Sequence, residues 1–184
     1  MTPDIQTLLQ EVLNNALRSL YANDPFLIEH DVNERSISHR LAMYIQAEMN
    51  NQISGWHVDC EYNRLGAELV NNHWRSKTLN LPVIGVMTDD TKAKTVYPDI
   101  NIHHRGKEGE EHNLLVIEIK KCSPTDIHDF KKLEEYGKQL DYQWGVFLNI
   151  ESKKTTGHWW KKGDYKPNLE NHDYELFYTV VNTN

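Results

Sequence analysis

The stretch LLVIEIK, residues 114–120, decides how this chain folds. Side chains alternate between the two faces of a strand, so Leu115 and the two isoleucines share one face. That face is entirely apolar and predicts a strand in the core of the protein. The opposite face carries Glu118 and Lys120, side by side at the end of the strand. The stretch therefore predicts a core strand that places an acid and an amine together.

A second stretch, YPDINIH at residues 97–103, alternates in the same way. Its two isoleucines are expected on the core face, which leaves Asp99 on the opposite face. The polar turn RGKEGEEH, residues 105–112, separates the two stretches. If they form a hairpin around this turn, their lengths permit a register in which Asp99 lies opposite Glu118 and Lys120.

Two acids and an amine in such a place point to metal chemistry. Two carboxylates about 4 Å apart repel by roughly 4 kcal/mol at an effective dielectric of 20. A cation between them keeps both ionised, and hard oxygen ligands with few partners fit Mg²⁺ or Mn²⁺, with bound waters and a substrate phosphate. Such an ion lowers the pKa of a water and neutralises phosphoryl charge. Lys120 would orient that water or stabilise the developing negative charge.

The rest of the chain predicts a mixed sheet flanked by helices, in one domain spanning residues 1–184. Hydrophobic periodicity predicts helices and strands in addition to the two stretches above. The expected helices are 4–21, Glu34–Met49 and Asp126–Tyr142, and the expected strands are Trp56–Tyr62, Gly145–Ile150 and Glu175–Val181. Residues 63–95 give no firm pattern, and Pro82 and Gly85 weaken a strand over Leu79–Val86.

The pattern Pro98-Asp99, eighteen further residues, then Glu118-Ile119-Lys120 resembles the signature of the PD-(D/E)XK nuclease superfamily. The resemblance covers about residues 33–150 and implies the restriction-endonuclease-like fold, an α/β (α+β) fold with core order αβββαβ. Residues 1–25 then form an added helix, and residues 151–184 a C-terminal extension.

The resemblance also implies an activity. Asp99 and Glu118 would be metal ligands, with the main-chain carbonyl of Ile119 as a third. Lys120 would assist hydrolysis of a phosphodiester bond by a metal-activated water, with Mg²⁺ or Mn²⁺ as cofactor and nucleic acid, in particular DNA, as substrate. In this superfamily the helix before the strands often contributes a glutamate, and Glu34 fits that position. Enzymes that cut both strands often pair, so a homodimer is left open.

Each of these residues also has a structural interpretation. Glu118 and Lys120 would form a charge pair on a solvated sheet face, and Asp99 would belong to turn chemistry at a strand start. Glu34 would complement the helix dipole in a first turn. A related alternative is a catalytically silent nuclease-fold module that binds nucleic acid or a protein partner.

Four further residues are candidates for substrate or metal contacts. Lys132 and Gln139 share one helical face with Tyr136 and could contact the scissile phosphate. His39 could face phosphate, and Glu61 could add a second metal contact. The alternative for all four is a solvated surface position.

The segment KKTTGHWWKKGDYK, residues 153–166, mixes basic and aromatic side chains. This composition suits a surface that tracks a nucleic-acid backbone, although a solvated hairpin with two packing tryptophans explains it as well.

Composition sets further limits. The net charge of −7 argues against tight, non-specific, metal-free binding to nucleic acid. No stretch approaches the ~20 apolar residues of a membrane span, and the N-terminus lacks the pattern of a signal peptide. Two cysteines in 184 residues do not make a disulfide framework, so the cytoplasm is the expected compartment.

Overall fold

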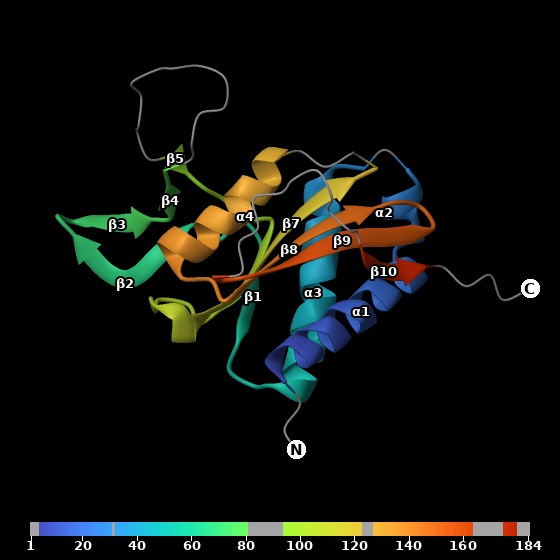
Figure 1. Ribbon diagram of the computed structural model, residues 1–184, viewed down its shortest axis with the longest axis horizontal. Coiled ribbons are helices and arrows are strands. Elements are labelled where there is room, and N and C mark those ends of the chain that lie inside the picture. Colours follow the sequence, from blue (N-terminus) through green and yellow to red (C-terminus); the bar gives the residue numbers. More distant parts are fainter. Residues whose placement is uncertain (1–3, 31, 81–93, 123–126, 164–174, 180–184) are drawn as a thin grey trace, which may run out of the picture.

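A mixed β-sheet with helices on both faces forms the body of the protein (Figure 1). The computed structural model describes residues 4–30, 32–80, 94–122, 127–163 and 175–179. Among these residues the main sheet has six strands in the order β1-β6-β7-β8-β9-β10. They are β1 (His57–Asp59), β6 (Ile100–His103), β7 (Asn113–Lys121), β8 (Trp144–Ile150), β9 (Lys154–Lys161) and β10 (Glu175–Thr179).

Four of the five neighbouring strand pairs in the main sheet are antiparallel, and one pair is parallel. Strands β1, β6 and β7 are antiparallel neighbours, β7 and β8 run parallel, and β8, β9 and β10 are again antiparallel. A parallel pair needs a crossover connection, and helix α4 (Ile127–Leu140) supplies it between β7 and β8. The predicted mixed sheet flanked by helices is therefore confirmed.

Strand β7 is buried on both faces, which explains its nearly continuous apolar sequence. Leu115, Ile117 and Ile119 pack against helices α1 (Ile5–Asn23) and α3 (Glu34–Gln52). Val116, on the other face, packs against the α4 side of the sheet. The predicted alternation along residues 114–120 is confirmed, and the face that carries Glu118 lies beneath α4 rather than in open solvent.

Helices α1 and α3 are close to the predicted 4–21 and 34–49, and each extends slightly further. The side chain of Asn33 caps α3 by accepting a hydrogen bond from the Arg35 N–H (2.9 Å). A short helix α2 (Pro25–Glu29) follows α1 and was not predicted. Its proline lies in the first turn, where the missing N–H costs nothing.

The insertion between β1 and β6 holds the elements that the sequence pattern did not reveal. Strands β2 (Arg64–Val70) and β3 (His73–Ser76) form a hairpin, and β4 (Thr78–Leu79) pairs with β5 (Lys94–Thr95). Asn71 and Asn72 form the hairpin turn with φ of 51° and 63°. Asparagine tolerates this left-handed backbone, so the two-residue turn was a usable signal. The predicted strand at 79–86 falls mostly outside the described residues.

Two predicted strands are shorter than expected. Strand β1 covers only residues 57–59 of the predicted 56–62, and Glu61 has a φ of 50°. That left-handed conformation is incompatible with an extended strand. Strand β6 begins at residue 100 instead of 97.

The segment at 153–166 also differs from the solvated hairpin considered in the sequence analysis, because its described part forms β9 within the main sheet. Trp159 packs against the α1–α3 core, and Trp160 lies against Gly137 of α4. The interpretation as a solvated hairpin was wrong in this respect, although both tryptophans do pack.

Candidate active site

Asp99 and Glu118 face each other across neighbouring strands. Ile100 pairs with Ile117 in the antiparallel register of β6 and β7, so one further step places Asp99 opposite Glu118. The carboxylate of Asp99 accepts a hydrogen bond from the Ile119 N–H (2.7 Å). The predicted hairpin geometry is confirmed, and it fixes Asp99 at the end of β7.

Glu118 is nearly inaccessible to solvent, with 3% of its surface exposed. Its Oε2 accepts a bond from Lys132 Nζ of α4 (2.7 Å), whereas its Oε1 has no hydrogen bond of ordinary geometry, although the Tyr136 hydroxyl lies beside Glu118. Burial raises the pKa of Glu118 to about 7; Lys132 opposes the shift, and the nearby Asp99 and Asp129 add to it. Burial also raises the pKa of Asp99, against the effect of the Ile119 bond and the two lysines. A buried carboxylate with an unbonded oxygen is costly unless something pairs with it.

Lys120 lies beside these acids and forms an ion pair with Asp129 of α4 (3.5 Å between Nζ and Oδ2). Burial alone would lower the pKa of Lys120, but Asp129, Glu34 and Asp99 together raise it. Lys120 therefore remains a cation at neutral pH.

The Glu34 side chain also lies at the end of β7, and it comes from α3 on the opposite face of the sheet. Its Oε1 accepts a hydrogen bond from the Lys121 N–H (3.1 Å), just past Lys120 on β7. Its charge also acts on Asp99 and Lys120. Glu34 stands in the first turn of α3 as well, so the helix-dipole interpretation and the position beside the candidate site are both compatible with the structure.

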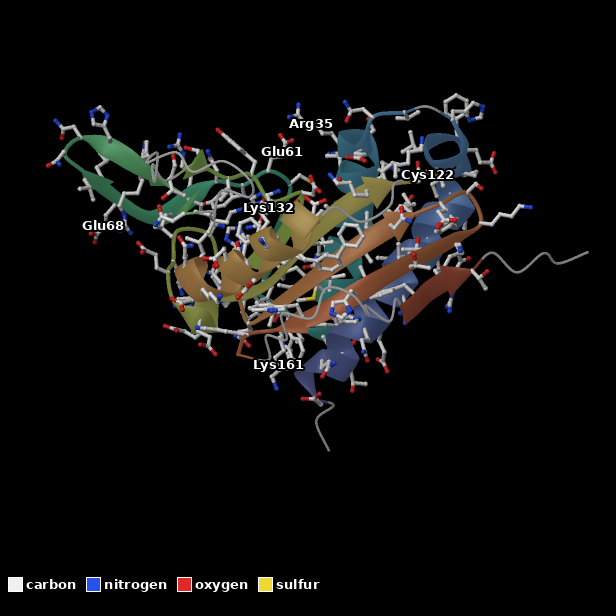
Figure 2. All side chains as sticks on the ribbon, turned by 45° about the horizontal axis from the view of Figure 1, so that its top comes forward. Arg35, Glu61, Glu68, Cys122, Lys132 and Lys161 are labelled. Atoms are coloured by element: carbon white, nitrogen blue, oxygen red, sulfur yellow. The ribbon has the colours of Figure 1, made fainter. Side chains whose placement is uncertain are left out.

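Helix α4 contributes more than the sequence analysis anticipated. Asp129 lies one turn before Lys132 on the same helical face, and this spacing of three was the signal that could have identified it. Tyr136 lies one turn further on, with a buried hydroxyl that makes no hydrogen bond of ordinary geometry. Burial raises the pKa of Tyr136, and the charge of Glu118 raises it further. Figure 2 shows Lys132 on α4, which runs across the sheet.

Six ionisable groups thus form what we call the Glu118 cluster: Glu34, Asp99, Glu118, Lys120, Asp129 and Lys132. Four carboxyls and two amines give a net charge of −2 when all are ionised. Burying excess charge of one sign is unfavourable without a counter-ion, and a divalent cation would balance it.

The residues fit such an ion in their chemistry. Asp99 and Glu118 offer carboxylate oxygens, and the unbonded Oε1 of Glu118 is a free acceptor. Two protein carboxylates with the remaining positions left to water and phosphate suit Mg²⁺. Among the described residues, no set of three or more His, Cys, Asp or Glu side chains is arranged to hold a metal by itself.

The other candidate residues lie outside this cluster. Gln139 bonds to the main chain of Asn80, with its Oε1 accepting and its Nε2 donating (3.0 and 3.1 Å), so it ties α4 to the end of β4. Glu61 forms an ion pair with Arg35 (2.7 Å) near the start of α3, where Figure 2 shows both. His39 is exposed one turn further along α3. Of the four candidates for substrate or metal contacts, Lys132 belongs to the Glu118 cluster, and Gln139, Glu61 and His39 do not.

No family model and no curated protein matches the chain. A solved structure described as "Crystal structure of SSO0001" aligns with 14% identity and a TM-score of 0.34, covering 84% of this chain. The chain spans 66% of the length of that protein. Within the part of the chain described here, no helix is both long and apolar enough to cross a membrane.

Proposed function

We propose that this protein is a metal-dependent nuclease that hydrolyses phosphodiester bonds of nucleic acid, specifically DNA, at a PD-(D/E)XK-type site. The observation that carries the proposal is the Glu118 cluster, in which four carboxyls outnumber two amines and one buried carboxylate oxygen has no hydrogen bond of ordinary geometry. Structural ion pairs are normally balanced and bonded, so this imbalance favours a site built for a cation.

The order of the elements supports the same proposal. Helix α3, strands β1, β6 and β7, helix α4 and strand β8 follow one another in the sequence, with the β2–β5 insertion after β1. This is the order αβββαβ that the resemblance implies, and it brings the Asp, Glu and Lys of the motif to one end of β7. We propose on this basis that the core has the restriction-endonuclease-like fold.

Each residue of the cluster has a defined part in the proposed chemistry. Asp99 and Glu118 would hold Mg²⁺ or Mn²⁺, together with the main-chain carbonyl of Ile119. The bound ion would supply Lewis acidity and lower the pKa of an attacking water. Lys120, protonated at neutral pH, would stabilise the charge that develops on the phosphoryl oxygens. Glu34 positions the end of β7 through the Lys121 N–H.

The contacts of the two lysines favour a second candidate, a catalytically silent module with the same fold. Lys132 is bonded to Glu118, and Lys120 is paired with Asp129, so amines already neutralise part of the acidic charge. A module of this kind would bind nucleic acid or a protein partner without turnover. Under the nuclease proposal, an incoming cation would replace Lys132 at Glu118.

Cleavage of labelled DNA with added Mg²⁺ or Mn²⁺ tests the proposal. We expect wild type and the surface control Lys107→Met to cut, and Asp99→Asn and Lys120→Met to lose activity by about 10²–10³-fold. Calorimetry with Mn²⁺ should show binding to wild type and none to Asp99→Asn. Absence of both cleavage and metal binding in wild-type protein would leave the silent module as the better account.

A further inference from the structure

An open pocket of about 460 Å³ lies at the junction of α2 and α3, outside the Glu118 cluster. Its lining comes from the end of α1, from α2 and from the first two turns of α3. The residues are Asp24, Leu27, Arg35, Ser36, His39 and Arg40. Hydrogen-bond donors outnumber acceptors in this lining, since only Asp24 carries an acidic side chain.

The acid in the pocket is already fully engaged. Asp24 accepts a hydrogen bond from the Arg40 Nε–H, which is shared between its two oxygens (3.0 and 3.1 Å), and one from the Tyr44 hydroxyl (2.5 Å). These bonds hold the Arg40 side chain in place and use the carboxylate oxygens. An anion entering the pocket would therefore meet donors without competing for an exposed acid.

The remaining donors are available to a ligand. Arg35 is 77% exposed, and its bond to Glu61 is a solvent-exposed ion pair of a kind that contributes little to stability. The Ser36 hydroxyl and the His39 imidazole make no hydrogen bond to any residue that the structure describes. The proposed pocket does not depend on free N–H groups at the start of α3, because the N–H groups of Arg35 and Ser36 already donate to Asn33.

The pocket also lies next to the candidate site. Glu34, which bonds to the end of β7, immediately precedes Arg35 on α3. The Glu61 N–H donates to the carbonyl of Pro98 (2.9 Å), so the partner of Arg35 is tied to the residue before Asp99. Side chains one to six residues beyond Glu34 lie about 1.5–9 Å further along the helix axis.

We propose that this pocket binds a backbone phosphate of the DNA strand, close to the bond that the Glu118 cluster cleaves. Arg35 is the principal contact, with His39 and Ser36 as additional donors and Arg40 as a fixed charge. The assignment of the neighbouring cluster as the cleavage site rests on the proposed function, whereas the phosphate contact can be measured without cleavage.

Binding of a fluorescein-labelled 20-base-pair DNA duplex, followed by anisotropy with Ca²⁺ in place of Mg²⁺, tests the proposal. We expect the double variant Arg35→Gln/His39→Gln to bind about tenfold more weakly than wild type. The slope of log affinity against log salt should become shallower by about 0.9 for each phosphate that the variant no longer neutralises. Arg35→Lys keeps the charge and should retain most of that slope.

Lys107→Gln is the matched control, since it also removes one exposed charge and lies in the turn before β7, at the opposite end of that strand from Glu118. It should bind DNA like wild type. Equal binding by the double variant and wild type, or no measurable binding by wild type, would overturn the proposal. The same holds if the double variant loses only its affinity for inorganic phosphate in calorimetry while its DNA affinity is unchanged.

These outcomes separate the pocket from the proposed function. Normal cleavage with no effect of the double variant on binding would remove the pocket and leave the nuclease. Loss of binding in the double variant of a protein that never cleaves would support the pocket and remove the nuclease.

Discussion

Two buried polar clusters lie on the α4 side of the sheet, and their internal balance differs. The Glu118 cluster has a surplus of acid and an unbonded carboxylate oxygen. The second, which we call the Lys77 cluster, consists of Lys77, Asn101 and Tyr142. Lys77 is only 2% exposed, and its Nζ donates to the Tyr142 hydroxyl (2.7 Å), which also bonds to the Asn101 amide (3.0 Å).

Aromatic rings complete the surroundings of the buried amine. Lys77 Nζ lies 5.1 Å from the ring centre of Tyr62 and 5.2 Å from that of Tyr142, both within cation–π range. Because each polar group in the Lys77 cluster has a partner, the network can stabilise the fold by itself. The Glu118 cluster holds more carboxyls than amines and leaves one buried carboxylate oxygen without a hydrogen bond of ordinary geometry, and this difference in hydrogen bonding distinguishes the two clusters.

The largest effect we expect is on catalysis, in the variant Glu118→Gln. It removes a proposed metal ligand and should lower DNA cleavage by at least about 10³-fold. Because it also removes a buried charge, the free energy of unfolding at pH 8 without metal should stay the same or rise. Activity assays and urea melts measure both. Normal cleavage by Glu118→Gln would show that the Glu118 cluster has a structural role, like the Lys77 cluster.

The opposite pattern is expected for Lys77→Ala. It empties a buried volume and leaves the Tyr142 hydroxyl without its donor, so stability should fall by about 2–4 kcal/mol. Cleavage per folded molecule should remain within about twofold of wild type, because Lys77 belongs to neither proposed contact set. Denaturant titration with activity normalised to the folded fraction would check this. A large loss of activity without loss of stability would contradict the distinction between the two clusters.

The third prediction uses pH. Burial raises the folded-state pKa of Glu118 from its ordinary 4.5 to about 7, so this group's contribution to stability is lost as pH rises from 4.5 through 7. Burial lowers the pKa of Lys77 from 10.5 to about 7, so its contribution grows as pH rises from 7 toward 10.5. The change in the free energy of unfolding caused by Glu118→Gln should therefore vary between about pH 4.5 and 7. The change caused by Lys77→Met should vary between about pH 7 and 10.5.

Metal affinity should follow the first of these windows. A cation binds the ionised form of Glu118, so Mn²⁺ affinity should rise by up to about tenfold per pH unit below pH 7 and level off above it. Calorimetry in buffers of different ionisation enthalpy should detect one proton released per ion at pH 6. Affinity independent of pH between 5.5 and 8 would show that Glu118 is not a ligand.

The sequence predicted the Glu118 cluster better than the Lys77 cluster, for a physical reason. Alternation along two strands placed Asp99, Glu118 and Lys120 on one face, and a one-residue shift would have exposed the isoleucines. Lys77 and Tyr142 are 65 residues apart and meet only through the β2–β5 insertion. No local period records such a contact. The spacing of three between Asp129 and Lys132 places both on one helical face, but the link of Asp129 to Lys120 depends on how α4 crosses the sheet.

The smallest expected effects come from one substitution made in each cluster. Tyr142→Phe removes a hydroxyl that bonds to both Lys77 and Asn101, so it should lower stability by about 1–2 kcal/mol. Tyr136→Phe removes a buried hydroxyl that has no hydrogen bond of ordinary geometry, so its effect should stay within about 0.5 kcal/mol. Paired thermal melts of the two variants at pH 8 measure the difference. If Tyr136→Phe proves as costly as Tyr142→Phe, the Tyr136 hydroxyl is bonded to Glu118 in solution, and the free acceptor proposed for the cation is already occupied.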